Sequence, residues 1–128
     1  MIKVIAGKLL RDTEFIGKMD PFVIIEYQGT KYKTSVIQGG GKKPVWNDLF
    51  EIEVHSMGDE LHIECYDEDI FVHDLIGIAT LPVSLLCHVQ ALRKWFPLQY
   101  HKKKSGMILL ETKYTPPLEQ WPESKDSF

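Results

Sequence analysis

Residues 50–66 read FEIEVHSMGDELHIECY, and apolar and polar side chains alternate in them on both sides of Met57-Gly58-Asp59. The alternation runs over residues 50–55 and again over residues 61–66. A period of two is typical of a strand with one buried and one solvated face, whereas a helix repeats every ~3.6 residues. The stretch therefore predicts two antiparallel strands joined by a short turn.

Similar short apolar runs occur along the rest of the chain, separated by turn signals such as Gln28-Gly29 and Gly39-Gly40-Gly41. Pro82 can open a short helical turn near Val83–Val89. Short strands at this spacing predict an all-β fold, an eight-stranded antiparallel β-sandwich. We expect its strands near residues 2–9, 22–28, 31–37, 48–55, 60–66, 75–81, 94–100 and 106–114.

The chain has 128 residues, of which 44% are hydrophobic, and a net charge of −3. This length and composition predict one domain, over residues 1–115, and exclude a wholly disordered chain. Residues 116–128 begin with two prolines, and we expect a flexible tail in which Trp121 could hold the segment against the body or a protein partner. The mildly acidic charge argues against a nucleic-acid partner.

The compartment is predicted from two features. The N-terminus begins with a predicted strand and lacks the pattern of a signal peptide, so we expect a cytoplasmic protein. Cys65 and Cys87 form no C-x-x-C pair, and we expect both to be buried and reduced.

Four predicted loops lie at one end of the sandwich, because antiparallel strands alternate in direction. The loops are Arg11–Pro21, Gln38–Asn47, Asp67–Asp74 and His101–Ser105. Seven of the 18 acidic residues fall in the first and third loops: Asp12, Glu14, Asp20, Asp67, Glu68, Asp69 and Asp74. A cluster of acids is often only solvated surface, but these loops also carry apolar residues, which is unusual at loop tips.

Converging carboxylates repel one another unless a cation neutralises them. The donors are all oxygen atoms on flexible loops, which suits calcium better than magnesium. The apolar residues are then interpreted as wedges for a membrane interface: Phe15, Ile16, Ile70, Phe71 and Val72. At the same end, Lys102, Lys103 and Lys104 would be attracted to anionic lipid.

Three motifs in order resemble those of one family, the C2 domain, a calcium- and phospholipid-binding module. Gly17-Lys18-Met19-Asp20-Pro21-Phe22 is similar to its G-K-x-D-P-[YF] motif, and Lys43-Pro44-Val45-Trp46-Asn47-Asp48 to N-P-x-W-N-E. Tyr66-Asp67-Glu68-Asp69 with Asp74-Leu75-Ile76-Gly77 resembles its third loop. The resemblance covers about residues 1–114 and implies the type II topology of small single-domain members.

The resemblance also implies a set of calcium ligands. The matching aspartates are Asp20, Asp67, Asp69 and Asp74, and the backbone carbonyls would come from Phe15 and Ile70. Glu14 stands where the family has aspartate, and the third loop is one residue shorter than usual. Lys31 and Lys33 match a strand that often recognises phosphoinositide head groups, although a solvated strand face would look the same.

These observations predict calcium-dependent binding to anionic phospholipid membranes through three loops, with Ca²⁺ as cofactor and peripheral recruitment from the cytoplasm. No catalytic motif was found, so we expect no enzyme. Glu14 and the short loop favour an alternative, a calcium-independent protein-interaction module of the same fold. Lys31 and Lys33 favour another, a calcium-independent phosphoinositide-binding module.

Overall fold

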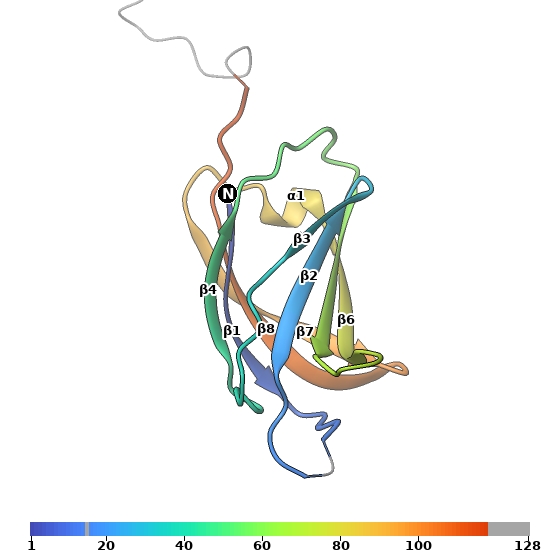
Figure 1. Cartoon of the computed structure of the whole chain (residues 1–128). Coiled ribbons are helices and arrows are strands. Elements are labelled where there is room, and N and C mark those ends of the chain that lie inside the picture. The colour runs from blue at the N-terminus through green and yellow to red at the C-terminus, as the bar shows by residue number, and fades with distance from the viewer. Residues whose placement is uncertain (15, 118–128) are drawn as a thin grey trace, which may run out of the picture.

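The computed structural model describes residues 1–14 and 16–117 (Figure 1). Within these residues it confirms the eight predicted antiparallel strands and the short helix between the sixth and the seventh. The elements are β1 (Ile2–Leu9), β2 (Pro21–Tyr27), β3 (Thr30–Lys33), β4 (Val45–Phe50), β5 (Glu60–Asp67), β6 (Asp74–Pro82), α1 (Val83–Leu86), β7 (Leu92–Tyr100) and β8 (Lys103–Thr112).

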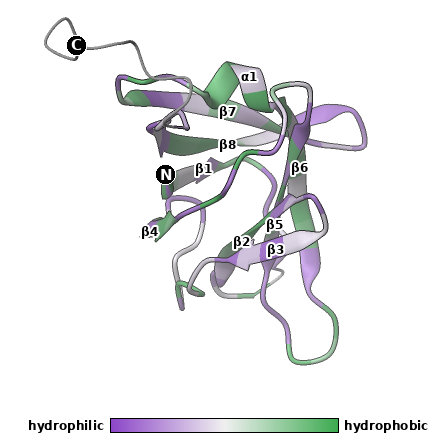
Figure 2. Cartoon of the chain, turned by 90° about the horizontal axis from the view of Figure 1, so that it is seen from above, coloured by the Kyte–Doolittle hydropathy of each residue, from purple (hydrophilic) through white to green (hydrophobic). Residues whose placement is uncertain are grey.

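The strands form two layers, β3-β2-β5-β6 and β7-β8-β1-β4, and the order and antiparallel pairing are those of the predicted sandwich. Figure 2 shows both layers from the end at which α1 lies. The layers are joined at β6 and β7 by a single paired position, Ile78 with Gln99. The layers are therefore free to fold over one another and to enclose the core between them.

The core is built from the inward faces of both layers, as the period of two predicts. On β5, Leu61 and Ile63 are buried, whereas His62 between them is exposed. Cys65 is buried as expected, but Cys87 is only half-buried, so that expectation was too strong. Both thiols are free.

Several element boundaries differ from those expected, and the clearest case is β4. This strand spans residues 45–50 rather than 48–55, because it pairs with β1, which begins at Ile2 opposite Phe50. Beyond Phe50, none of the strands in the described part of the chain pairs with this segment, so residues 51–55 keep their alternating burial without a ladder. The strand β3 also ends early, at Lys33, where the Thr34 hydroxyl accepts the Val23 N–H in place of a ladder bond (2.9 Å).

The β7–β8 connection is tighter than expected. His101 and Lys102 alone form the turn, with φ of 49° and 64°, so Lys103 and Lys104 belong to β8 rather than to a loop. The helix α1 is shorter than expected and ends at Leu86.

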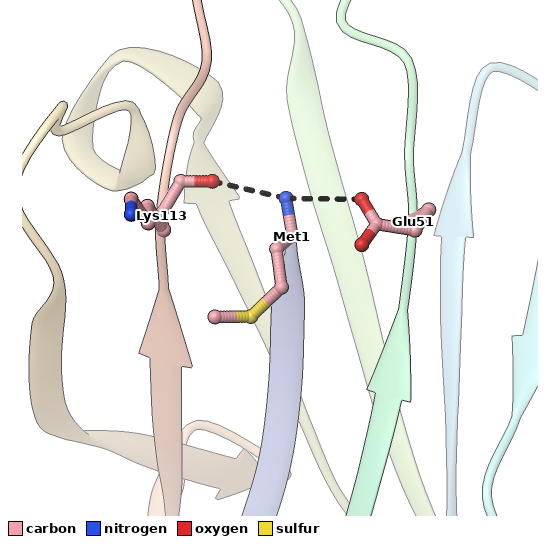
Figure 3. Close-up of polar contacts among 3 residues, drawn as sticks. All are labelled: Met1, Glu51 and Lys113. Carbon is pink, nitrogen blue, oxygen red and sulfur yellow. Dashed lines mark hydrogen bonds and ion pairs between the residues drawn. The ribbon is translucent and has the colours of Figure 1, made fainter.

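The N-terminal residue lies at the same end of the molecule as α1, away from the β1–β2 loop (Figure 1). The amino group of Met1 donates to the carbonyl of Lys113 at 3.0 Å and lies 3.7 Å from a carboxylate oxygen of Glu51 (Figure 3). These contacts join the start of β1 to the segments that follow β8 and β4. No helix among the described residues is long and apolar enough to cross a bilayer.

Candidate functional site

The loops predicted to share one end of the sandwich are bonded to one another. Asp20 lies at their centre: its carboxylate accepts the N–H of Gly39 (2.7 Å) and its carbonyl accepts the N–H of Glu68 (3.0 Å). The carbonyl of Ser105 on β8 accepts the N–H groups of Leu10 and Arg11 at 2.8 and 3.0 Å. The β1–β2 loop is thus hydrogen-bonded to the β3–β4 loop, to the β5–β6 loop and to β8.

Asp67, the last residue of β5, has a fully buried side chain. One carboxylate oxygen accepts the hydroxyl of Thr13 at 2.8 Å, and the other accepts the N–H of Asp20 at 2.7 Å. Burying a carboxylate is costly unless it is hydrogen-bonded, and these two donors provide that compensation. Asp67 therefore holds the β1–β2 loop against the end of β5.

Glu14 shows that negative charge concentrates here. Its pKa is raised to about 7, chiefly by a hydrogen bond to Asp67 and by the charge of Asp67. Burial and the charges of Asp69 and Asp20 raise the pKa further. The carboxyl of Glu14 therefore retains its proton at a pH where an ordinary glutamate is ionised.

The other predicted ligands are less constrained. Asp69 is exposed, and one of its oxygens accepts the N–H of Ile70 at 2.6 Å. Asp74 begins β6, pairs with Asp67 in the β5–β6 ladder and is half-buried. Asp12, which carries no ligand role in the family pattern, accepts the N–H of Glu14 at 3.0 Å and so shapes the loop.

The donor chemistry at this end fits a hard divalent cation, since the charges of Asp20, Asp67 and Asp69 all act on Glu14 and every donor is oxygen. The geometry is open, however. Among residues 1–14 and 16–117, no three Asp, Glu, His or Cys side chains are arranged to hold one metal ion. Asp67 is also already bonded through both oxygens.

The tips of the same loops carry exposed apolar side chains. Ile70, Phe71 and Val72 are 90%, 92% and 74% exposed, and Ile16 is 87% exposed. Phe15, predicted both as a carbonyl ligand and as an inserting residue, lies outside the described residues. Four large apolar groups in water beside an acidic cluster mark a surface for an apolar or amphipathic partner.

The predicted basic residues fall in two places. Lys31 and Lys33 are exposed on the edge strand β3, and the Lys33 ammonium lies 4.4 Å from the ring centre of Phe22. Lys102, Lys103 and Lys104 are exposed on the β7–β8 hairpin. In the described part of the chain, the only ion pair joins Met1 and Glu51, so these lysines and the acidic loops are not neutralised by each other there.

Three residues that shape this end belong to none of the predicted ligand, inserting or basic sets. Thr13 holds Asp67, and the guanidinium of Arg11 donates to the carbonyl of Leu75 (3.2 Å) while lying 3.7 Å from the Tyr100 ring centre. His73 packs edge-on against Phe22, and its Nδ1 accepts the Asp69 N–H at 3.2 Å. Nothing in the local pattern marks these residues, because their partners are distant in sequence or lie across a loop.

Comparison with known proteins agrees with the geometry. A sequence model of the C2 domain family matches residues 1–98. The 16 kDa phloem protein 1 of Arabidopsis thaliana is 37% identical over 91 residues, which is 66% of this chain and 58% of that protein. The chain thus spans less than two thirds of the length of this relative.

Solved structures show the same fold. A C2 domain of a plant Extended Synaptotagmin 1 superposes with a TM-score of 0.80 at 24% identity, covering 90% of this chain and 92% of that one. A calcium-bound pair of C2 domains from Extended-Synaptotagmin 2 superposes with a TM-score of 0.74 at 27% identity, covering 88% and 44%. With the family match over residues 1–98 and the sandwich topology, these likenesses show that the chain belongs to the C2 domain family.

Proposed function

We propose that this C2 domain docks on anionic phospholipid membranes through the β1–β2 and β5–β6 loops, and that Ca²⁺ triggers the docking. The observation that carries the proposal is the exposed apolar tip Ile70-Phe71-Val72 between Asp69 and Asp74. A tip of this kind gains free energy in the interfacial region of a bilayer, but the adjacent carboxylates are repelled by anionic lipid.

A bound cation would supply positive charge to cancel that repulsion. Its ligands would be the carboxylates of Glu14, Asp20, Asp67, Asp69 and Asp74, with backbone carbonyls of Phe15 and Ile70. The raised pKa of Glu14 supports this role, because its proton partly relieves the same repulsion that a cation would relieve. The likeness to calcium-bound domains of Extended-Synaptotagmin 2 also supports it.

The chain's own residues would then orient the domain on the membrane. Ile16 and the tip Ile70–Val72 would enter the interface, and Phe15 is proposed as a further inserting residue. Lys102, Lys103 and Lys104 on the β7–β8 hairpin would contact head groups at the same end, each contributing about 1 kcal/mol near an anionic surface. These are binding roles, and we propose a membrane-targeting module rather than an enzyme.

Sedimentation with vesicles of phosphatidylcholine and phosphatidylserine tests the calcium step. The full chain should pellet in calcium and remain in the supernatant with EGTA. The pair Asp69→Asn with Asp74→Asn should abolish the calcium-dependent fraction, since both residues lie outside the Asp67 hydrogen-bond network. The matched control, Glu53→Gln with Glu60→Gln, removes the same charge from exposed residues outside the acidic loops and should pellet normally. Pelleting that ignores EGTA would reject the calcium trigger.

A calcium-independent mode is the second candidate, favoured by the open geometry of the carboxylates and by the exposed Lys31 and Lys33 on β3. It predicts that the chain sediments with phosphoinositide-containing vesicles in the presence of EGTA. The double substitution Lys31→Glu with Lys33→Glu should remove this binding. The Asp69→Asn and Asp74→Asn pair should leave it intact. A chain that binds neither vesicle in either condition favours a protein-interaction module.

A further inference from the structure

A cavity of about 380 Å³ lies among residues near α1, away from the acidic loops. Its size falls in the range of about 300–1,000 Å³ that is typical of binding pockets. The wall is largely apolar and comes from β1, β5, α1 and the extended segment after β4: Ile2, Ile52, Val54, Leu61, Val83 and Leu86. An open apolar cavity of this size on a small domain is a candidate binding site.

The chain itself runs along the rim of this cavity where the described part ends. The N–H of Lys113 donates to the carbonyl of Met1 at 3.0 Å, and the N–H of Tyr114 donates to the carbonyl of His88 at 2.7 Å. Thr115 and Pro117 then line the cavity. The course of the backbone is thus fixed up to Tyr114, and the chain passes Pro117 while still in contact with the cavity wall.

The sequence that follows contains large apolar side chains that could fill the cavity. Leu118 comes directly after Pro117 and Trp121 lies three residues further on, and most other residues of the segment are polar. Four residues reach at most about 14 Å, so Trp121 cannot lie far from the rim. The rim charges nearly balance, since Glu51 faces the Met1 amino group and Glu53 is accompanied by Lys113. Charge therefore does not exclude the acidic segment.

We propose that the cavity is the docking site of the chain's own residues 118–121, with Trp121 as the side chain that fills it. The tryptophan contributes a large apolar surface, and its indole N–H needs an acceptor, which the Glu53 carboxylate at the rim can provide. The C-terminal segment is then part of the sandwich rather than a free arm.

The half-buried thiol of Cys87 reports on this docking, because Cys87 lines the cavity while Cys65 is fully buried. In the full chain, we expect Trp121→Ala to accelerate the reaction of Cys87 with a disulfide reagent several-fold, because exposure controls thiol reactivity. The matched control is Trp95→Ala, which removes a tryptophan from β7 outside the cavity and should leave the rate unchanged. Equal rates in the wild-type chain and Trp121→Ala would overturn the proposal.

A second measurement does not depend on removing the tryptophan. The full chain is labelled with 5-fluorotryptophan and studied by fluorine NMR. The resonances of the three tryptophans are assigned with single Trp→Phe variants. The Trp121 resonance should lie away from its position in urea, and Val54→Phe, which fills the cavity from its own wall, should return it to that position. A Trp121 resonance at the urea position in the native chain would contradict docking. A displacement that disappears on dilution would place Trp121 in a second copy and overturn the intramolecular proposal.

Discussion

At the scale of a single residue, the carboxyl group of Asp67 has two roles to reconcile, that of a calcium ligand and that of a hydrogen-bond acceptor. The family pattern assigns it to calcium, whereas its oxygens already accept hydrogen bonds from Thr13 and Asp20. A carboxylate oxygen has two lone pairs, so one hydrogen bond leaves room for a further interaction. Asp67 can thus act as a structural acceptor, and its proposed role as a ligand would come in addition.

The structural role predicts the effect of Asp67→Asn on the free energy of unfolding. The amide has one acceptor oxygen, so one of the two donors loses its buried partner, at a cost of about 1–3 kcal/mol. Urea unfolding with a chelator, near pH 5 so that Glu14 stays protonated, measures this loss. Asp69→Asn is the control, because Asp69 is exposed, and should change stability by less than ~0.5 kcal/mol. Equal effects of the two substitutions would contradict the structural role.

Glu14 predicts how stability depends on pH in the absence of calcium. Its pKa is raised from 4.5 to about 7 in the folded chain. Between these two pKa values the folded state holds a proton that the unfolded state releases. The stability that Glu14 contributes is therefore present below pH 4.5 and is lost as the pH rises through about 7. Glu14→Gln cannot ionise and should become more stable relative to the wild-type chain as the pH rises.

The measurement is the urea midpoint of the wild-type chain and of Glu14→Gln, taken with a chelator at several pH values between about 5 and 8. Glu60→Gln, at an exposed position away from the acidic loops, should follow the wild-type curve. A constant difference between wild type and Glu14→Gln would show that Glu14 has an ordinary pKa.

At the scale of elements, the β5–β6 loop combines a fixed base with a projecting tip. Its base is held by Asp67 and by His73, which packs against Phe22, while Ile70, Phe71 and Val72 extend into solvent. The proposed docking needs this arrangement, because an ordered base spares the tip from losing conformational freedom on binding.

The tip predicts the effect of Phe71→Ala on vesicle binding. A fully buried phenylalanine contributes about 1.5–3 kcal/mol. Because Phe71 would be only partly inserted, removing its ring should weaken partitioning to vesicles by about tenfold. Vesicle titration in calcium measures this change. Val89→Ala removes an apolar group that is exposed between α1 and β7, and should have no effect. Unchanged partitioning of Phe71→Ala would exclude the tip from the membrane contact.

At the scale of the whole molecule, the two layers meet closely at Gly77 on β6. A Cβ atom at this position would approach the Cβ of Leu98 to 2.9 Å and would also collide with the Ser105 hydroxyl. Both neighbours belong to the other layer, on β7 and β8. The absence of a side chain at Gly77 thus permits the contact by which the layers are joined.

This contact predicts that Gly77→Ala lowers the free energy of unfolding by about 1–3 kcal/mol, as overpacking does. Ser105→Ala should not destabilise the chain, because the buried Ser105 hydroxyl has no hydrogen-bond partner among the described residues. Combining it with Gly77→Ala should recover part of the loss, measured by urea unfolding. A Gly77→Ala chain as stable as the wild type would refute the close approach.

The sequence alone was sufficient for the number of strands, their order along the chain and the gathering of acids at one end. These features follow from local causes: side chains alternate with a period of two, and antiparallel strands return every second loop to the same end. The motifs around Asp20, Trp46 and Asp67 are also sufficient to indicate the family, which the family match over residues 1–98 confirms. The ligand roles of the carboxylates and of Phe15 and Ile70 stay predictions.

Only the tertiary structure decided features that depend on contacts between distant segments. The strand β4 ends at Phe50 because β1 begins at Ile2, and Asp67 turns inward because Thr13 and Asp20 supply donors across the sandwich end. The cavity near α1 likewise exists only where β1, β5, α1 and the chain after β8 meet. Local patterns record which face of a strand is apolar, but partners far apart in sequence become neighbours only after the layers have packed.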